Sequence, residues 1–461
     1  MGNRPRKKVK KSLAAPRSAP PAEKPELVRR LLRSIVVLYL FFALAYAVQI
    51  PFGKAPDETA HLRYVTYLTQ HHRLPVFQST NPGADYEFHQ PPLYYVLALP
   101  SYTLTRGAPA QKGQTVRFFS LLIGLALVYL TYALARRLVP DRPWTALAAT
   151  AIVAFLPMHL HLAASVGNDV LTEVWFAAAL LLLVGYLRVS AGYRAGGPAP
   201  AWRTALWVGL FIGLGMLTKS LASMLFPVAW AGFALSARGP ESYQWRRLAR
   251  DVGICTGVAL LLCGWWLVRN QMLYGDPLAQ GAFLRAFTDR PSPQAVMAAF
   301  QAKTGEPLSP TWYVLAMVVP WTVASALGVF GPKTTGNDFV FYPVWVYLAA
   351  AAVGLLALFG FVHYLRRERL ASWQAGSWLI IALLAALVLA SFVRFNLSYF
   401  QAQARYLFPA LPPAALAACL GLEQYAPRRY GSWVSLTVAA ALGLLALVGL
   451  AVWIAPQFIS L

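Results

Sequence analysis

The chain has 461 residues, of which 58% are hydrophobic and only 12% are charged, and its mean hydropathy is +0.51. Soluble domains carry about 25% charged residues, so this composition excludes a purely soluble protein. The same apolar content excludes disorder for most of the length. Because apolar runs of about 20 residues recur along the sequence, we expect an all-α polytopic membrane protein.

Positive charge is concentrated at the amino terminus of this strongly basic chain, whose formal net charge is +23. Residues 1–33 contain 11 Lys or Arg and 2 Glu, and the first 25 residues contain five prolines. This composition predicts a disordered basic tail over 1–33, which anionic lipid on the cytoplasmic leaflet would attract. We expect the tail to contact membrane lipids and not nucleic acid.

The apolar segment 34–50 follows this tail and has two interpretations. It is either an uncleaved first membrane span or a secretory signal with Ala45-Tyr46-Ala47 as its cleavage site. The long apolar stretch and its long basic leader favour the uncleaved span. The membrane domain would then cover residues 34–461.

Eleven membrane spans are predicted, and one further apolar segment, 312–331, is ambiguous. With the tail, the short loops of one side hold 26 of the 40 basic residues, but only if 312–331 does not cross. The positive-inside rule therefore places the amino terminus inside and the carboxyl terminus outside, with 312–331 as a re-entrant or surface-lying helix. The expected spans are 34–51, 116–135, 144–163, 169–187, 203–217, 220–236, 251–268, 341–364, 376–393, 404–421 and 432–454.

Two long loops, 52–115 and 270–340, fall on the outer side in this topology. The outer side holds 14 basic and 10 acidic residues, so the acids lie mainly outside although the bases lie mainly inside. That asymmetry calls for a functional reason. No internal repeat is visible, which argues against the inverted-repeat plan of many transporters.

The first outer loop opens with Pro56-Asp57-Glu58-Thr59-Ala60-His61. Proline suits a helix start and acids suit the first turn, while Asp57 and His61, four residues apart, share a face. We expect an amphipathic helix on the outer surface that presents a carboxylate at headgroup level. Helix capping with a solvated charge is the alternative.

The same loop continues with His89 and Gln90, directly before Pro91-Pro92 and an apolar run. The proline pair predicts a second helix start, whose free N–H groups would form an anion site beside the two polar side chains. An ordinary interfacial helix with an aromatic belt is the alternative.

Four cations, Lys219, Arg269, Arg394 and Arg405, lie at span ends on the outer side, where the charge rule disfavours them. Each alone could extend to the interface. A shared anionic ligand, such as a lipid-linked phosphate, would explain all four. Asp169 opens the fourth span, either as a helix cap or as a functional acid.

In this order, the motifs resemble those of the GT-C superfamily of polytopic glycosyltransferases. Protein O-mannosyltransferases, the lipid A aminoarabinose transferase and oligosaccharyltransferase catalytic subunits belong to it. The resemblance covers about residues 34–421. It rests on Asp57-Glu58 with His61, His89–Tyr95, Leu217-Thr218-Lys219, Arg269-Asn270 with Tyr274–Pro277, and Arg405–Pro409.

The resemblance implies a polyprenyl-phosphate-linked sugar donor and an acid of the first outer loop acting near the acceptor. Asp57 would be the general base, with Glu58 as support or alternate, and Asp169 matches a second acidic position. We expect the donor's phosphate and sugar to contact His61, His89, Gln90, Lys219, Arg269, Arg394, Arg405 and Tyr406.

Two departures from the superfamily stand out. The oligosaccharyltransferases bind a divalent metal through Asp-x-Asp, whereas the acids here are adjacent, so we expect no metal and no other cofactor. The aminoarabinose transferases place a lysine before Pro-Pro, whereas Gln90 stands there in this chain.

The sequence leaves the acceptor unknown and alternatives open. A lipid-linked glycan flippase or other transporter would place charges in mid-span. A surface-polysaccharide polymerase or ligase would carry key residues in a large later loop such as 270–340. A non-catalytic scaffold would not need the outer acidic pair. Residue usage and compact loops indicate a bacterial inner membrane, with the site on its extracytoplasmic side.

Overall fold

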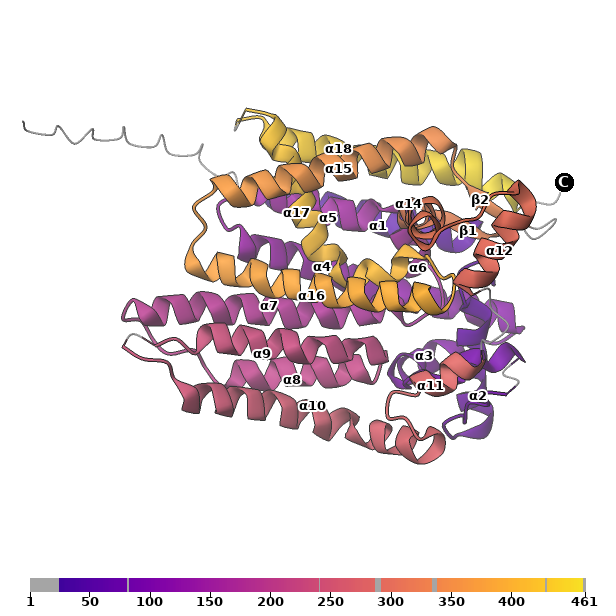
Figure 1. Cartoon of the computed structure of the whole chain (residues 1–461), viewed down its shortest axis with the longest axis horizontal. Coiled ribbons are helices and arrows are strands. Elements are labelled where there is room, and N and C mark those ends of the chain that lie inside the picture. The colour runs from indigo at the N-terminus through magenta and orange to yellow at the C-terminus, as the bar shows by residue number, and fades with distance from the viewer. Residues whose placement is uncertain are drawn as a thin grey trace, which may run out of the picture.

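The computed structural model describes residues 25–80, 83–239, 241–286, 292–333, 338–427 and 429–458. Long helices lie side by side along one axis of the molecule (Figure 1). In the described ranges, nine helices are long and apolar enough to cross a membrane, or ten with one bent pair. The longest are α1 (Pro25–Gln49), α4 (Pro109–Leu138), α7 (Asp169–Arg194), α10 (Trp245–Tyr274), α15 (Val344–Arg367), α16 (Ser372–Ser398) and α18 (Gly431–Val448).

All eleven expected spans coincide with helices, but the count of eleven is not confirmed. The bent pair is α5 (Pro143–Phe155) and α6 (Pro157–Ala163), which meet at 62°. Pro157 lacks an N–H and cannot continue the ladder of α5, which explains the bend. Two other expected spans, α8 (Arg203–Met216) and α9 (Leu225–Ser236), have only 14 and 12 residues.

The first helix begins earlier than the sequence predicts. Helix α1 starts at Pro25, so the last nine residues of the expected tail, 25–33, are helical. Arg30 pairs with Glu26 one turn before it at 3.3 Å, which supports a helix in this polar stretch. The rest of the expected tail, 1–24, lies outside the described residues.

Most of the ambiguous segment 312–331 is helical, in a stretch made of α13 (Pro310–Tyr313), η3 (Val314–Val318) and α14 (Val319–Leu327), and its last residues begin β1 (Val329–Pro332). It is long and apolar enough to span a membrane. Figure 1 shows α14 nearly end-on, whereas the long helices lie across the view. Helix α14 therefore runs across the axis of the bundle, and its re-entrant or surface-lying placement stays a prediction.

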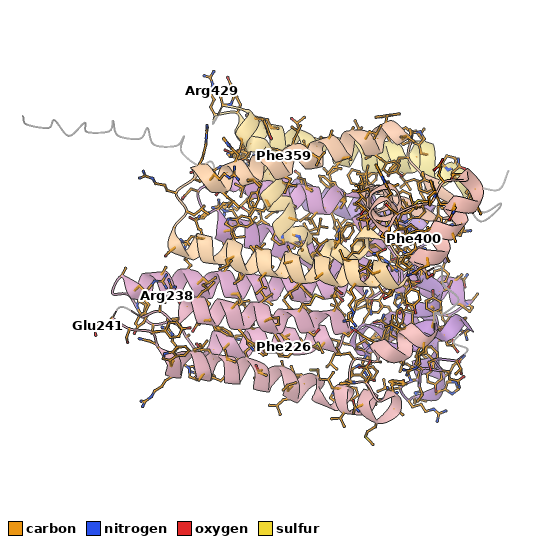
Figure 2. All side chains as sticks on the ribbon, in the orientation of Figure 1. Phe226, Arg238, Glu241, Phe359, Phe400 and Arg429 are labelled. Carbon is orange, nitrogen blue, oxygen red and sulfur yellow. The ribbon has the colours of Figure 1, made fainter. Side chains whose placement is uncertain are left out.

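The two long loops meet at one end of the bundle, on the right in Figure 1. They form α2 (Glu58–His71), η1 (Gly83–His89), α3 (Leu93–Thr103), α11 (Gln280–Ala286), α12 (Pro293–Thr304) and the antiparallel pair β1 (Val329–Pro332) and β2 (Phe339–Phe341). Figure 2 shows Arg238, Glu241 and Arg429 at the opposite end. The basic loops and the motif-bearing loops therefore lie at opposite ends.

Close helix contacts depend on glycine. A Cβ added to Gly209 of α8 would lie 2.4 Å from the carbonyl oxygen of Cys255 on α10. Gly360 of α15 and Gly421 of α17 (Leu411–Leu422) approach each other's helices as closely, at 2.1 and 2.0 Å. Small residues allow this approach in lipid, where packing drives association. Large apolar side chains such as Phe359, which is 66% exposed, face outward.

The charge asymmetry gives a topology that can be tested by cysteine labelling. We expect Cys at position 241 (Glu241→Cys) to resist a membrane-impermeant maleimide in intact cells and Cys at position 301 (Gln301→Cys) to react. The native Cys255, Cys263 and Cys419 are buried and give little background. Labelling at 241 but not at 301 would invert the topology.

Candidate active site

A cavity of about 550 Å³ lies at the end of the bundle that carries the two long loops. Side chains from α2, η1, η2 (Ser220–Met224), α11, α16 and η4 (Ala404–Ala410) line it. Its polar wall includes most of the predicted site residues, and Leu221, Met224, Leu387, Val388 and Phe392 form an apolar wall. One cavity therefore presents both charged groups and an apolar surface.

Asp57 occupies a special backbone position at the start of α2. Its φ of 57° is left-handed, a conformation that few non-glycine residues adopt. Its Oδ1 accepts a hydrogen bond of 3.0 Å from the Tyr86 hydroxyl, and its Oδ2 is ion-paired with Arg405. The strained turn aims the carboxylate at the cavity, as expected of a functional position.

Arg405 bridges two acids that are far apart in sequence. Its guanidinium contacts Asp57 through one nitrogen and Asp169 through the other, the latter at 3.3 Å. Asp169 also pairs with Lys219, which lies between α8 and η2. Two carboxylates thus alternate with two cations in a row of four side chains, and their formal charges sum to zero. Arg394, by contrast, lines the cavity and forms no ion pair with any described residue.

His61 and His89 lie on the same wall in buried surroundings. The Nδ1 of His61 is 2.8 Å from the Tyr95 hydroxyl and 3.9 Å from a carboxylate oxygen of Glu87. His89 donates from Nδ1 to the Tyr86 carbonyl, at 2.7 Å. Burial lowers the pKa of His89 to about 4 and also lowers that of His61, so both rings are neutral at physiological pH.

Carboxylate ionisation on this wall is set by competing effects. Burial alone would raise the pKa of Asp57, but the Arg405 guanidinium and further favourable contacts bring it below its ordinary value. Burial raises the pKa of Glu87, whose neighbours do not compensate it. Of Asp57 and Glu87, Asp57 is therefore the carboxylate that stays ionised to the lower pH.

Gln90 lines the cavity and is also linked, through Asn168, to the turn that carries Lys219. Its side-chain oxygen accepts from Asn168 at 3.2 Å, and Asn168 also donates to the carbonyl of Thr218. The N–H of Leu93, at the predicted helix start, donates to the carbonyl of Leu217 at 2.8 Å and is not free for an anion. These bonds join the loop 52–115 to the turn that carries Lys219.

Glu58 does not serve as an alternate base in this arrangement, which corrects the sequence expectation. It is 1% exposed, does not line the cavity and binds Arg117 of α4 through both oxygens, at 2.7 and 2.6 Å. It also accepts from the N–H groups of Gly53 and Val166. Arg117 itself donates to the carbonyls of Ala47, Ile50 and Pro51. The pair fixes the turn that holds Asp57.

The sequence predicts that Arg269 contacts the donor, but Arg269 does not line the cavity. It donates to the carbonyl of Pro75 at 2.6 Å and lies over the Trp266 ring. The neighbouring motif is structural as well. Asp276 accepts from the N–H groups of Leu278 and Gly281, at 3.0 and 2.7 Å, and this turn starts α11 against the cavity.

The structure adds residues to which sequence reasoning gave no role. Glu87 and Asn168 are buried, line the cavity and each have an oxygen with no hydrogen-bond donor among the described residues. Phe283 of α11 packs on His89 with ring centroids 4.6 Å apart. Glu87 stands two residues before His89, between Tyr86 and Phe88. An acid between two aromatic residues was the feature of the sequence that could have pointed to it.

No arrangement suited to a resident metal is found among the described residues, where no group of three His, Cys, Asp or Glu side chains converges. Asp57 and Asp169 both contact the same guanidinium, which takes the place that a cation would need between them. The residues present therefore do not fit a divalent ion in this conformation.

Comparison with known proteins places the fold. Residues 89–266 match the family model described as dolichyl-phosphate-mannose-protein mannosyltransferase. ArnT from Cupriavidus metallidurans, in a crystal structure with undecaprenyl phosphate, aligns with a TM-score of 0.53 and 16% identity over 93% of this chain and 66% of its own. The chain has the fold of the GT-C glycosyltransferases. The fold that the sequence resemblance implies is therefore confirmed.

The GT-C fold also relates the chain to an oligosaccharyltransferase from Archaeoglobus fulgidus, crystallised with a tethered acceptor peptide. That alignment has a TM-score of 0.51 and 15% identity over 92% of this chain and 55% of the other. The chain thus spans between about half and two thirds of the length of these proteins. No curated protein matches its sequence.

Breaking the Glu58–Arg117 pair should destabilise the protein. We expect Glu58→Gln to lower the free energy of unfolding by about 3–5 kcal/mol, because it leaves a buried guanidinium without its counter-charge. Unfolding in mixed micelles titrated with a denaturing detergent measures this change.

The matched control is Arg63→Gln, since Arg63 and Asp85 form an ion pair with side chains 54% and 40% exposed. That change should cost about 0–1 kcal/mol. Equal stability of Glu58→Gln and the wild type would contradict a structural role for the pair.

Proposed function

We propose that this protein is a membrane glycosyltransferase that moves a sugar from a polyprenyl-phosphate donor to an acceptor hydroxyl, with inversion at the anomeric carbon. One observation carries the proposal: Asp57, Lys219 and Arg405 line one cavity that also has an apolar side, and Asp169 is ion-paired with both of these cations. The GT-C fold and the mannosyltransferase family match support it.

The donor would use both walls of the cavity. Its polyprenyl chain would lie against the apolar residues of α16 and η2, and its phosphate would approach Lys219 and Arg394. Arg394 has no acidic partner among the described residues and is therefore available to an anion. Ser220 and Ser223 line the same region and would donate hydrogen bonds to the phosphate, whereas the Nε2 of neutral His89 can only accept and would orient a hydroxyl of the sugar.

Asp57 would act as the general base. As the acceptor oxygen forms its bond to the anomeric carbon, the bond from that carbon to the phosphate oxygen breaks, and the phosphate keeps the electron pair. The acceptor proton becomes acidic during attack and passes to Asp57. A carboxylate with a low pKa suffices for this late transfer, and the neighbouring cations stabilise the departing phosphate.

We place the reaction on the extracytoplasmic side of a bacterial inner membrane, because the site lies at the end opposite the basic loops. Helix α11 would cover the site, as Leu278 to Leu284 line the cavity from the second outer loop. A flippase or a polysaccharide polymerase remains the alternative outcome of the assays below. A flippase would move labelled donor across liposomes without releasing its sugar.

Removing the charge of Asp57 tests the base directly. We expect Asp57→Asn to lower kcat by about 10²–10⁴-fold and to leave donor affinity within a small factor. Release of labelled sugar from a polyprenyl-phosphate donor measures turnover. Asp85→Asn, at the 40% exposed partner of Arg63, is the control and should retain activity. Wild-type turnover in a folded Asp57→Asn variant would remove Asp57 as the base.

The acidic limb of the pH profile should report the Asp57–Arg405 contact. Arg405 holds the pKa of Asp57 down against burial, so Arg405→Gln should raise this pKa and protonate the base at higher pH. We expect the acidic limb of the pH profile of kcat/KM to shift to higher pH by about one pH unit or more, while the overall rate also falls. An unmoved limb, or one displaced to lower pH, would contradict this assignment; Arg63→Gln is the charge-matched control.

A further inference from the structure

A second, smaller cavity of about 70 Å³ adjoins the large one. Six residues line both cavities, among them Asp57 and Arg405, so the Asp57 carboxylate lies at the boundary between them. The small cavity has four lining residues that the large cavity lacks, namely Tyr86, Tyr399, Gln401 and Gln403. A base at the junction of two cavities is positioned to act between two bound groups.

The wall of the small cavity contains acceptor oxygens that lack donors. Gln403 Oε1 and Glu87 Oε2 are buried and receive no hydrogen bond from any described residue. The amide nitrogen of Gln403 is already used, since it donates to Gln401 Oε1 at 3.0 Å. Because a buried acceptor without a donor is costly, this wall fits a ligand that supplies several O–H donors.

The loop that carries the two glutamines is held in place. The N–H of Gln401 donates to Asn396 Oδ1 at 3.1 Å, and Asn396 donates to the Phe392 carbonyl at 3.0 Å. The Tyr399 hydroxyl donates to the Leu284 carbonyl of α11 at 2.6 Å. The polar groups of the small cavity are therefore pre-positioned, which lowers the entropic cost of binding.

The chemistry of these walls distinguishes between acceptor classes. Tyr86 and Tyr399 present aromatic rings beside amide and carboxylate groups, a combination that suits the alternating C–H and O–H surfaces of a sugar. A serine or threonine of a peptide brings one hydroxyl, which would donate to Asp57, so only backbone N–H groups would be left for the two donor-free oxygens. An alcohol on a lipid would bring apolar surface to a mainly polar wall.

We propose that the small cavity is the acceptor subsite and that it binds a hydroxyl-rich saccharide. The inference rests on the proposed function, with the donor in the large cavity. One sugar hydroxyl would donate to Asp57 and attack the anomeric carbon, whose bond to the phosphate oxygen breaks with the electron pair on the phosphate. Neighbouring hydroxyls would donate to Gln403 and Glu87.

The experiment measures binding of methyl hexopyranosides to the full-length protein in detergent, loaded with undecaprenyl phosphate, by saturation-transfer NMR. A threonine-containing tripeptide and a short-chain alcohol are the comparison probes. We expect saturable binding of at least one glycoside, weakened about tenfold by Gln403→Leu and by Gln401→Leu. The matched control is Gln301→Leu on the exposed face of α12, which should leave binding unchanged.

The readouts separate this inference from the proposed function. Undecaprenyl phosphate affinity should stay the same in all three variants, which reports an intact large cavity and fold. Absence of glycoside binding, wild-type binding in both folded cavity variants, or saturable binding of only the tripeptide or alcohol would overturn the saccharide subsite. The proposed function would then still stand on donor cleavage and its dependence on Asp57.

Discussion

The guanidinium of Arg405 joins three parts of the chain that are far apart in sequence, and the site depends on this contact. It binds Asp57, 348 residues away, and Asp169, 236 residues away. These groups lie in a low-dielectric region at the end of a membrane bundle, where an unpaired charge is costly. Pairing lets both acids remain charged. It also fixes the loop 52–115, the start of α7 and the start of η4 relative to one another.

A second buried pair provides the rigidity that the first requires. Glu58 and Arg117 lie directly behind Asp57, and their hydrogen bonds reach the end of α1 and the turn that follows it. Adjacent acids in sequence therefore face opposite ways: Glu58 points into the protein and Asp57 toward the cavity. The left-handed backbone at Asp57 is maintained because its neighbour is held on every side.

The two cavities that meet at Asp57 differ in the chemistry of their walls. The large one combines cations with an apolar wall, which matches an amphiphilic phosphate, whereas the small one is narrow and rich in hydrogen-bonding groups. Asp57 and Arg405 belong to both walls. A transfer reaction needs two substrates whose reacting atoms meet beside a base, and proximity of this kind supplies much of the rate acceleration in enzymes.

The sequence by itself determined the membrane class, the helix positions and which end of the bundle carries the two long loops. These features follow from the length of apolar segments and the charge of loops, which are local properties of the sequence. It also predicted that Asp57, Lys219 and Arg405 lie close together, as they do at one cavity. Only the tertiary structure decided that Glu58 and Arg269 are structural, that Gln90 binds Asn168, and that Glu87 and the 399–403 segment line the cavities. Those outcomes depend on which side chains from distant segments meet and which way each one points, and no local pattern encodes that.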